Sequence, residues 1–318
     1  MTLHRSLEES VSAPARTRSE AFASRDWALL TAVALMWGSS FWLIDIGLDH
    51  LQPTAVAWLR ILFGAATLAC IPAARHGIRQ ADWWGVGLLG LVWMVAPFTL
   101  FAFAQQSIDS SLAGMINGAA PLFTAVIAAV WSRRLPTGKL LTGLFIGFAG
   151  VLAINWPQGQ GAAGTGLGVG LVLSATLLYG VAFNLAVPLE ERNGALPVIW
   201  RAQLVSVVVA APAGLVGAAG SSFAWPSLLA LVALGVFSTG LAFAAFTTLV
   251  GRVGAARGSI TVYFIPVIAI LLGVVLLDET VAVIAIGGTA LVLVGAYLTS
   301  RSTRGEPTAG DESHRPTA

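Results

Sequence analysis

Two segments of this chain match each other without a gap, yet their connecting loops carry opposite charge. Residues 110–155 align on residues 255–300 at a constant offset of 145, and at this offset Arg133 falls on Asp278. Because loops rich in Lys and Arg stay on the cytoplasmic side of a membrane, the two copies are expected to cross the bilayer in opposite directions. Inverted repeats of this kind are typical of secondary transporters.

The composition is that of a membrane protein. Hydrophobic residues make up 57% of the 318 residues and charged residues only 10%, against about 25% charged in a soluble globular domain. A net charge of +2 gives no reason to expect a nucleic-acid partner. The single cysteine, Cys70, excludes a disulfide within the chain and any CxxC redox or metal motif. We therefore expect no cofactor and no metal.

Ten apolar segments approach the roughly 20 residues that a spanning helix needs. The expected fold class is an all-α membrane protein of ten transmembrane helices, arranged as two inverted five-helix repeats. Because each copy has an odd number of spans, the second copy crosses the membrane in the opposite orientation to the first. The segments are 27–48, 53–71, 82–103, 110–131, 137–154, 166–189, 197–218, 225–250, 255–277 and 281–300.

Lys and Arg fall on alternate connections between these segments. The two tails and every second loop hold 15 of the 17, and the other five connections hold none. Both termini are therefore expected in the cytoplasm. The predicted organisation is a disordered tail over 1–26, the first repeat over 27–155, the second repeat over 156–300 and a disordered tail over 301–318.

The glycines of the last segment in each half predict closely packed helix faces. Small residues let transmembrane backbones approach one another, since lipid supplies no hydrophobic force between helices. We favour tight packing within a monomer, and the alternative is the seam of a homodimer. The glycines are Gly143, Gly147, Gly287, Gly288 and Gly295.

Short motifs follow one another in a set order along these segments. They are Trp37-Gly38-Ser39-Ser40-Phe41, Arg60-Ile61-Leu62, the mid-helix prolines Pro121 and Pro266, Gly254-Ala255-Ala256-Arg257 and Leu277-Asp278-Glu279. In this order they resemble the drug/metabolite transporter superfamily, in its EamA branch, over about residues 27–300. The first copy departs from the family pattern, because it ends in Ser132-Arg133-Arg134 where an acidic ending is common.

The resemblance implies export, or facilitated movement, of small metabolites such as amino acids across a bacterial inner membrane. It also implies a multi-pass protein with a central cavity between the halves, walled mainly by the third, fourth, eighth and ninth segments. Transport is then expected to proceed by alternating access, as one half rocks against the other.

Polar and aromatic residues inside the apolar segments predict where a substrate binds. Polar groups in lipid are costly unless they face protein or a water-filled cavity, and a midspan Trp needs an acceptor for its indole N–H. For the aromatic residues the alternative is packing against lipid. The candidate substrate-binding residues are Trp37, Ser40, Arg60, Trp93, Asn117, Tyr179, Asn184, Thr239 and Tyr263.

For Arg60, and for the carbonyls that precede the two mid-helix prolines, the sequence leaves two interpretations open. Arg60 is expected first to pair with Asp45 near the outer end of the neighbouring segment, and second to contact a substrate carboxylate. Proline leaves the carbonyl four residues before it without its helical donor. The carbonyls of Asn117 and Val262 are therefore expected either to be open to a substrate ammonium group or to be satisfied by neighbouring side chains.

The residues absent from the segments also restrict the mechanism. We expect no Asp, Glu or His deep in the membrane, where proton-driven pumps place titratable relays, so uniport or exchange is predicted. An enzyme would need a nucleophile with a base, a metal triad or paired carboxylates, and no such set is found. The alternatives are an exchanger of phosphorylated sugars, an exporter of drugs or lipids, and a membrane scaffold that transports nothing.

Overall fold

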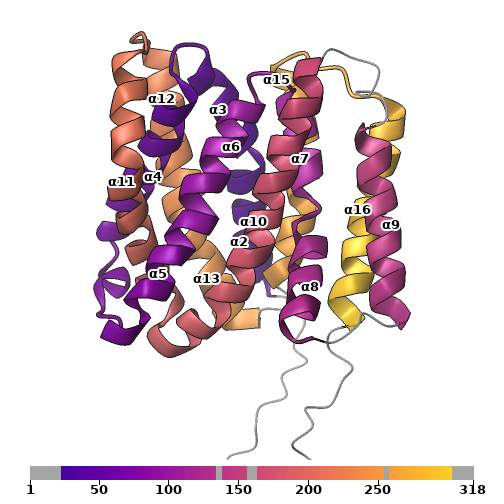
Figure 1. The fold of residues 1–318 in the computed structure, drawn as a ribbon, viewed down its shortest axis with the longest axis horizontal. Helices are drawn as coiled ribbons and strands as arrows, with labels where there is room; N and C mark the ends of the chain where they lie inside the picture. Colours follow the sequence, from indigo (N-terminus) through magenta and orange to yellow (C-terminus); the bar gives the residue numbers. More distant parts are fainter. Residues whose placement is uncertain (1–22, 134–137, 156–162, 254–257, 303–318) are drawn as a thin grey trace, which may run out of the picture.

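The computed structural model describes residues 23–133, 138–155, 163–253 and 258–302, and Figure 1 shows their arrangement. All regular structure in these residues is helical, as predicted, with no strand among them. Most of both predicted tails lies outside the described residues. The first described helix begins at Ser24, three residues before the predicted start of the first segment.

The described helices follow the predicted segments closely. In the first half they are α2 (Ser24–Gly38), α3 (Ser40–Leu48), α4 (Pro53–Ala69), η1 (Pro72–Arg75), η2 (Gln80–Asp82), α5 (Trp83–Gly90), η3 (Leu91–Val95), α6 (Ala96–Ala104), α7 (Ser110–Asn117), α8 (Ala120–Trp131) and α9 (Gly138–Asn155). In the second half they are α10 (Ala163–Asn193), α11 (Ala195–Ala219), α12 (Trp225–Ala233), η5 (Leu234–Leu241), α13 (Ala242–Val253), η6 (Ser259–Phe264), α15 (Ile265–Leu276) and α16 (Val283–Ser302).

Six stretches of the described chain are long and apolar enough to cross a membrane. They are Ser24–Leu48, Gln80–Ala104, Ser110–Trp131, Thr165–Asn193, Ala195–Ala219 and Trp225–Val253. Four shorter apolar helices accompany them, at Pro53–Ala69, Leu141–Ile154, Thr261–Leu276 and Val283–Leu298. Large apolar side chains such as Trp84, Val208 and Leu152 are more than 70% exposed, which suits a lipid-facing surface. The protein is a helical membrane protein.

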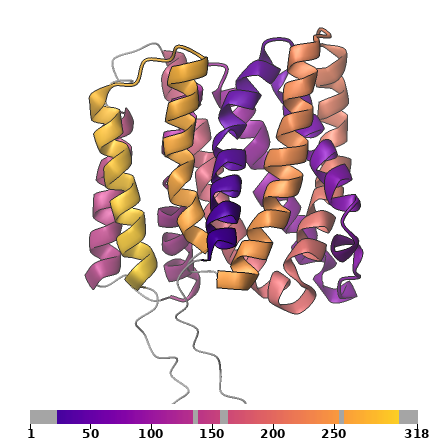
Figure 2. The ribbon, with the colours of Figure 1, turned by 180° about the vertical axis from the view of Figure 1, so that it is seen from behind.

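The helices of the two halves interleave. Helix α4 packs against α11 and η5, α10 against α6 and α8, and α15 against α7, whereas α9 and α16 pair with each other at one edge of the bundle (Figures 1 and 2). The C-terminal end of α8 and the α15–α16 connection lie at opposite ends of the bundle (Figure 1). Contacts between far segments of the chain therefore hold the bundle together.

Helices α4 and α11 are joined by a reciprocal pair of hydrogen bonds. The indole N–H of Trp58 donates to the Val207 carbonyl at 3.1 Å, and that of Trp200 donates to the Ala65 carbonyl at 3.1 Å. Trp58 and Trp200 are 142 residues apart, and so are Ala65 and Val207. The same contact is thus made twice, once by each helix upon the other, as in an interface built around a two-fold axis.

Helices α9 and α16 approach through glycine. A Cβ added at Gly150 would lie 2.6 Å from the Gly288 carbonyl oxygen, and one added at Gly288 would lie 2.8 Å from that of Gly150. Gly295 packs equally closely upon the backbone of Gly143 and Gly147. Four of the five predicted glycines therefore pack one helix on another within the chain, as we favoured from the sequence. The prediction is wrong for Gly287, where an added Cβ would meet nothing within 4 Å.

Five of the spans that were predicted as continuous helices are interrupted. Ser39 separates α2 from α3, residues 118 and 119 separate α7 from α8, and a 3-10 turn, η6, precedes α15. Two π-helical segments, η3 and η5, interrupt the spans of α5–α6 and α12–α13. Pro121 and Pro266 occupy the first turns of α8 and α15, where proline is tolerated but prevents continuation from the preceding helix.

Candidate functional site

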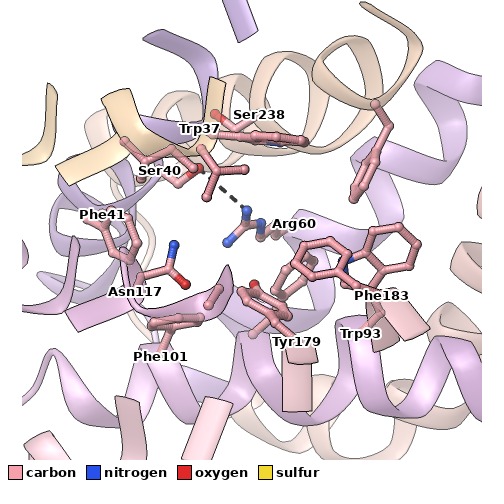
Figure 3. A pocket seen from close by; sticks show the side chains of 15 residues that line it. Trp37, Ser40, Phe41, Arg60, Trp93, Phe101, Asn117, Tyr179, Phe183 and Ser238 are labelled. Carbon is pink, nitrogen blue, oxygen red and sulfur yellow. Dashed lines mark hydrogen bonds between the residues drawn. The ribbon is translucent and has the colours of Figure 1, made fainter. Parts of the chain in front are cut away.

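Every one of the five interruptions contributes residues to one cavity between the two halves (Figure 3). Its volume is about 80 Å³, which is space for several water molecules at the roughly 10–15 Å³ that each requires. The lining residues are Trp37, Ser40, Phe41, Arg60, Trp93, Phe98, Phe101, Asn117, Ala120, Tyr179, Phe183, Ser238, Phe243, Val262 and Ile265.

Arg60 supplies a positive charge to this cavity, and neutral groups hold its side chain. The residue is 6% exposed. Its Nε donates to Thr239 Oγ1 at 2.9 Å, and one terminal nitrogen donates to Ser40 Oγ at 3.5 Å, as the dashed line in Figure 3 marks. The guanidinium carbon lies 3.8 Å from the centre of the Phe98 ring, a cation–π contact that stabilises a desolvated cation.

No carboxylate among the described residues lies within 4 Å of Arg60. The expected pair with Asp45 is therefore wrong. The α3 residue that faces Arg60 is Ser40, and Asp45 lies five residues further on, about 140° around the helix and about 7.5 Å along it. A buried cation without a counter-ion is costly in a membrane protein, so this arrangement needs an explanation beyond stability.

Two further polar groups in the cavity have no partner among the described residues. Asn117 is 7% exposed and its side-chain oxygen accepts no hydrogen bond, and Ser238 is 1% exposed and its hydroxyl makes none. Leaving such a group unsatisfied costs about 1–3 kcal/mol. In Figure 3 both side chains border the same space as Arg60. A bound ligand or water would supply the missing partners.

Aromatic rings form much of the cavity wall. The Trp93 ring meets Phe183 and Phe243 edge to face, with ring centres 5.5 and 5.2 Å apart. Tyr179 lies 5.8 Å from Phe101 and 6.2 Å from Phe183. Such packing fixes the rings, and their faces and edges present a rigid apolar surface to the cavity.

The structure brings most of the predicted site residues together. Six of the nine line the cavity, namely Trp37, Ser40, Arg60, Trp93, Asn117 and Tyr179. Thr239 lies behind the lining, where it accepts the Arg60 hydrogen bond and donates to the Leu234 carbonyl within η5.

Two further predicted residues also lie outside the lining. The Asn184 amide bridges α10 to α8 by donating to the Thr124 carbonyl at 2.9 Å and to the Gly180 carbonyl at 2.8 Å. Tyr263 packs against the larger apolar core beside Val262, which does line the cavity. The Val262 carbonyl accepts the Ile265 N–H, so it is neither open nor satisfied by a side chain, the two alternatives expected from the sequence. A tighter 3-10 turn supplies a backbone donor three residues on.

The site prediction missed several lining residues, among them Phe98, Phe243 and Ser238. A signal for two of them was present, because Phe98 falls on Phe243 at the repeat offset of 145. Ser238 was not among the predicted residues, although its neighbour Thr239 was. Among the described residues, no three His, Cys, Asp or Glu side chains are grouped to hold a metal.

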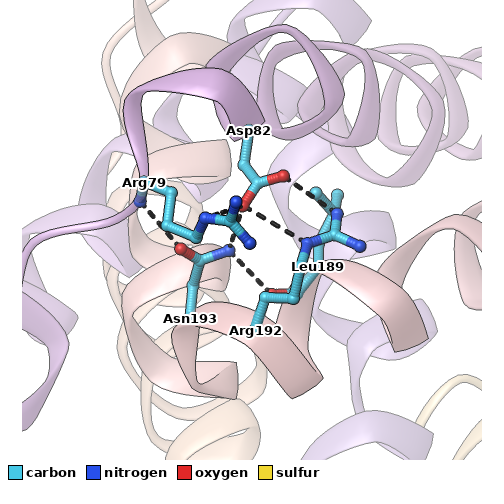
Figure 4. A network of polar contacts seen from close by, with 5 residues as sticks. All are labelled: Arg79, Asp82, Leu189, Arg192 and Asn193. Atoms are coloured by element: carbon cyan, nitrogen blue, oxygen red, sulfur yellow. Dashed lines mark hydrogen bonds and ion pairs between the residues drawn. The ribbon is translucent and has the colours of Figure 1, made fainter.

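Polar contacts join the two halves at one end of the bundle (Figure 4). The Asp82 carboxylate, in η2, accepts a hydrogen bond from Arg192 Nη2 at 2.9 Å and from Asn193 Nδ2 at 2.8 Å, both at the C-terminal end of α10. The Asn193 side-chain oxygen accepts the Arg79 backbone N–H at 2.8 Å. We refer to Arg79, Asp82, Arg192 and Asn193 as the Asp82 network.

A different contact joins the halves at the opposite end. Glu279, between α15 and α16, accepts the backbone N–H groups of Ser110 and Ser111 at 2.8 and 2.9 Å. These are the first two residues of α7, whose amides have no partner within the helix. One carboxylate thus caps the N-terminus of a helix in the other half, where a negative charge is favourable.

Comparison with known protein families identifies the class of protein to which this cavity belongs. The model of the EamA-like transporter family matches twice, at residues 27–156 and 166–301, which together are most of the chain. This chain belongs to the EamA-like transporter family. Membership agrees with the resemblance that the sequence motifs indicated.

Relatives of this chain are named as transporters. A probable terminal-alkyne amino-acid exporter of Streptantibioticus cattleyicolor is 27% identical over 88% of this chain and 94% of its own length. The uncharacterized inner membrane transporter YedA of Escherichia coli K12 is 28% identical over 85% of this chain and 90% of its own. A probable amino-acid metabolite efflux pump of the same strain is 26% identical over 86% of this chain and 94% of its own length.

A solved crystal structure shares the fold. It superposes with a TM-score of 0.59 at 17% sequence identity, and the match covers 89% of this chain and 99% of that one. At this identity the likeness concerns the fold alone.

Proposed function

We propose that this protein is an inner-membrane transporter that exports small metabolites, or facilitates their movement, through the cavity at Arg60. The observation that carries the proposal is the meeting of five interrupted spans at one cavity that holds the buried Arg60 and Asn117 side chains. Irregular backbone at membrane depth is tolerated where it lines a cavity, and transporters place discontinuous helices around their substrate sites. A scaffold that transports nothing would have no need of such a site.

Amino acids are the substrates that the observations favour. Two of the relatives are named as exporters or efflux pumps of amino acids or their metabolites. The cavity combines a cation and unpaired polar groups with an aromatic wall, which suits a small amphipathic molecule. A phosphorylated sugar carries at least two charges and calls for several cations, whereas Arg60 is the only Lys or Arg in the described lining.

Ten spans in two inverted repeats, 27–155 and 156–300, are part of this proposal. The family model matches each half separately. Reciprocal contacts between α4 and α11, and between α9 and α16, support a two-fold relation. Arg133 and Asp278, which correspond at the offset of 145, are the two non-glycine residues of the described chain with positive φ, at 52° and 53°.

The proposed topology has both termini in the cytoplasm, and labelling from one side of the membrane tests it. In a Cys70→Ala background we introduce Ser132→Cys and Thr280→Cys, both at exposed loop positions next to the charge-inverted pair. A membrane-impermeant thiol reagent added to intact cells is expected to modify the Thr280→Cys variant and to spare the Ser132→Cys variant until the cells are opened. Equal labelling of both in intact cells contradicts the inverted repeat.

A transport assay tests the proposed site. The Asn117→Ala variant is expected to lower uptake of neutral amino acids into proteoliposomes about 10–100-fold, since a hydrogen bond to a charged group contributes about 1.5–3 kcal/mol. Ser174→Ala is the matched control, because its exposed hydroxyl bonds only within α10. Unchanged uptake in the Asn117→Ala variant removes this residue from the site.

The same assay tests uniport or exchange. No Asp, Glu or His is found in the described lining of the cavity, so no titratable relay is available there. We expect uptake to follow the amino-acid gradient alone. A strict requirement for a pH gradient contradicts this part of the proposal.

A further inference from the structure

At the Arg60 site, corresponding positions of the two halves carry different residues. A Cβ at Gly235 would lie 2.9 Å from the Arg60 carbonyl oxygen, and one at Gly90 would lie 2.6 Å from that of Ala202. Gly90 falls on Gly235 at the repeat offset of 145. The equivalent of Arg60 in the second half is therefore Ala202, which has no charge.

The same asymmetry holds at the interrupted spans. Asn117 falls on Val262 at the offset of 145, and both line the cavity. The first half therefore contributes a cation and an amide to the cavity, whereas the corresponding residues of the second half are Val262 and Ala202, of which Ala202 is not among the described lining residues. This difference is a property of the cavity that a symmetric pore would lack, and it gives a bound molecule a preferred orientation.

The Arg60 guanidinium retains most of its hydrogen-bonding capacity. Of the five N–H donors that an arginine side chain carries, two are directed to Thr239 and Ser40, the second at a long 3.5 Å. Three donors remain for which the described residues offer no acceptor. A planar fork of free donors on a desolvated cation matches a carboxylate, which accepts two parallel hydrogen bonds.

We propose that Arg60 binds the α-carboxylate of the substrate and that the Asn117 side-chain oxygen accepts a hydrogen bond from the substrate's ammonium group. The side chain of the substrate then lies against Trp93, Phe183 and Phe243. The substrate class is then α-amino acids with an uncharged apolar or aromatic side chain. This inference rests on the proposed transport function and specifies what the same cavity recognises.

The charge distribution also predicts which molecules are rejected. A dicarboxylic amino acid would bring a second negative charge against the aromatic wall, where the described lining offers no second cation. A lysine or arginine substrate would bring a second positive charge into a cavity that already holds Arg60. Both arrangements leave a charge unpaired in a desolvated space, which is strongly unfavourable.

Competition measurements on the full chain in proteoliposomes test the inference. The probe is radiolabelled L-phenylalanine, and the competitors are L-phenylalaninamide and phenethylamine, which lack the carboxylate, and 3-phenylpropionate, which lacks the ammonium group. We expect unlabelled L-phenylalanine and L-leucine to compete, and the two compounds without a carboxylate to compete at least about 30-fold more weakly, as expected for loss of one partner of a buried charge pair.

Variants assign the effect to Arg60. Arg60→Gln is expected to weaken L-phenylalanine binding at least about 30-fold and to abolish the preference for the carboxylate, and Arg60→Lys to restore part of both. Arg201→Gln is the matched control, because Arg201 donates to the Ala74 carbonyl outside the cavity. Size-exclusion profiles in detergent report whether each variant is folded.

The outcomes separate this inference from the proposed function. If the wild-type protein transports L-phenylalanine but L-phenylalaninamide and phenethylamine compete as well as the amino acid does, the assignment of Arg60 is overturned and the transport function stands. A folded Arg60→Gln variant with unchanged selectivity overturns it in the same way. If the wild-type protein takes up no amino acid, both proposals fail together.

Discussion

Two adjacent glycines of α16 have opposite surroundings. A Cβ at Gly288 would lie 2.8 Å from both the Gly150 carbonyl oxygen and the Ile154 nitrogen, whereas one at Gly287 would meet nothing within 4 Å. Both atoms near Gly288 belong to the α9 backbone, which cannot move aside as a flexible side chain would. Close approach of the two helices therefore depends on one glycine and not on its neighbour.

The Gly288→Ala variant is expected to be less stable than the wild type by about 1–3 kcal/mol, the usual cost of overpacking a helix interface. The Gly287→Ala variant should be neutral or slightly stabilising, because alanine favours a helix by up to about 1 kcal/mol over glycine. Melting temperatures of the two variants in one detergent provide the comparison. Equal melting temperatures would show that α9 and α16 do not pack through Gly288.

At the scale of single residues the sequence predicted several of the side chains that line the cavity, but not their hydrogen-bond partners. Arg60 and Asn117 stood out because a charge or an amide inside an apolar run is costly. Arg60 nevertheless bonds Thr239 on η5 and not Asp45 on the neighbouring helix. Pairing depends on which face of each helix meets its neighbour, and spacing within one segment does not contain that information.

At the scale of helices the sequence predicted where spans begin and end more accurately than whether they are continuous. Pro121 and Pro266 mark two of the five interruptions, because proline cannot continue the preceding helix. The π-helical η5 contains no proline, and its Thr239 hydroxyl donates to the Leu234 carbonyl five residues back. Within this segment Thr239 also accepts the Arg60 hydrogen bond from α4, and π-bulges often occur at functional sites.

The interruptions also explain why the site prediction was only partly complete. In a regular helix, Ser238 and Thr239 point about 100° apart, and the sequence alone favoured Thr239. In η5, Ser238 lines the cavity and Thr239 holds Arg60 from behind. Two adjacent residues of η5 thus have different roles, and these roles depend on how α4 packs against η5.

At the scale of the whole molecule, contacts between the two halves lie at both ends of the bundle. The Asp82 network joins η2 to α10 at one end, and Glu279 joins the α15–α16 connection to α7 at the other. In the proposed transport by alternating access, each contact is expected to break while the other holds. Because each is charge-assisted, each stabilises closure of its own end, and weakening one shifts the population toward opening there.

Substitutions that weaken the contact at one end or the other are therefore expected to expose the cavity to opposite sides of the membrane. In a Cys70→Ala, Ser238→Cys background, Glu279→Gln should increase labelling of the cavity thiol from outside the cell, and Asp82→Asn should increase labelling from the cytoplasmic side in inside-out vesicles. Loss of a charge-assisted hydrogen bond corresponds to about a 10–100-fold shift in the ratio of the two states.

The chain offers a matched control for each variant. Asp278→Asn removes a charge next to Glu279 at a positive φ that asparagine tolerates, and Glu191→Gln removes an exposed charge next to Arg192. Neither control should change labelling from either side. If Glu279→Gln and Asp82→Asn raise labelling from the same side, the two contacts do not close opposite ends of one pathway, and the rocking of one half against the other is not the transport motion.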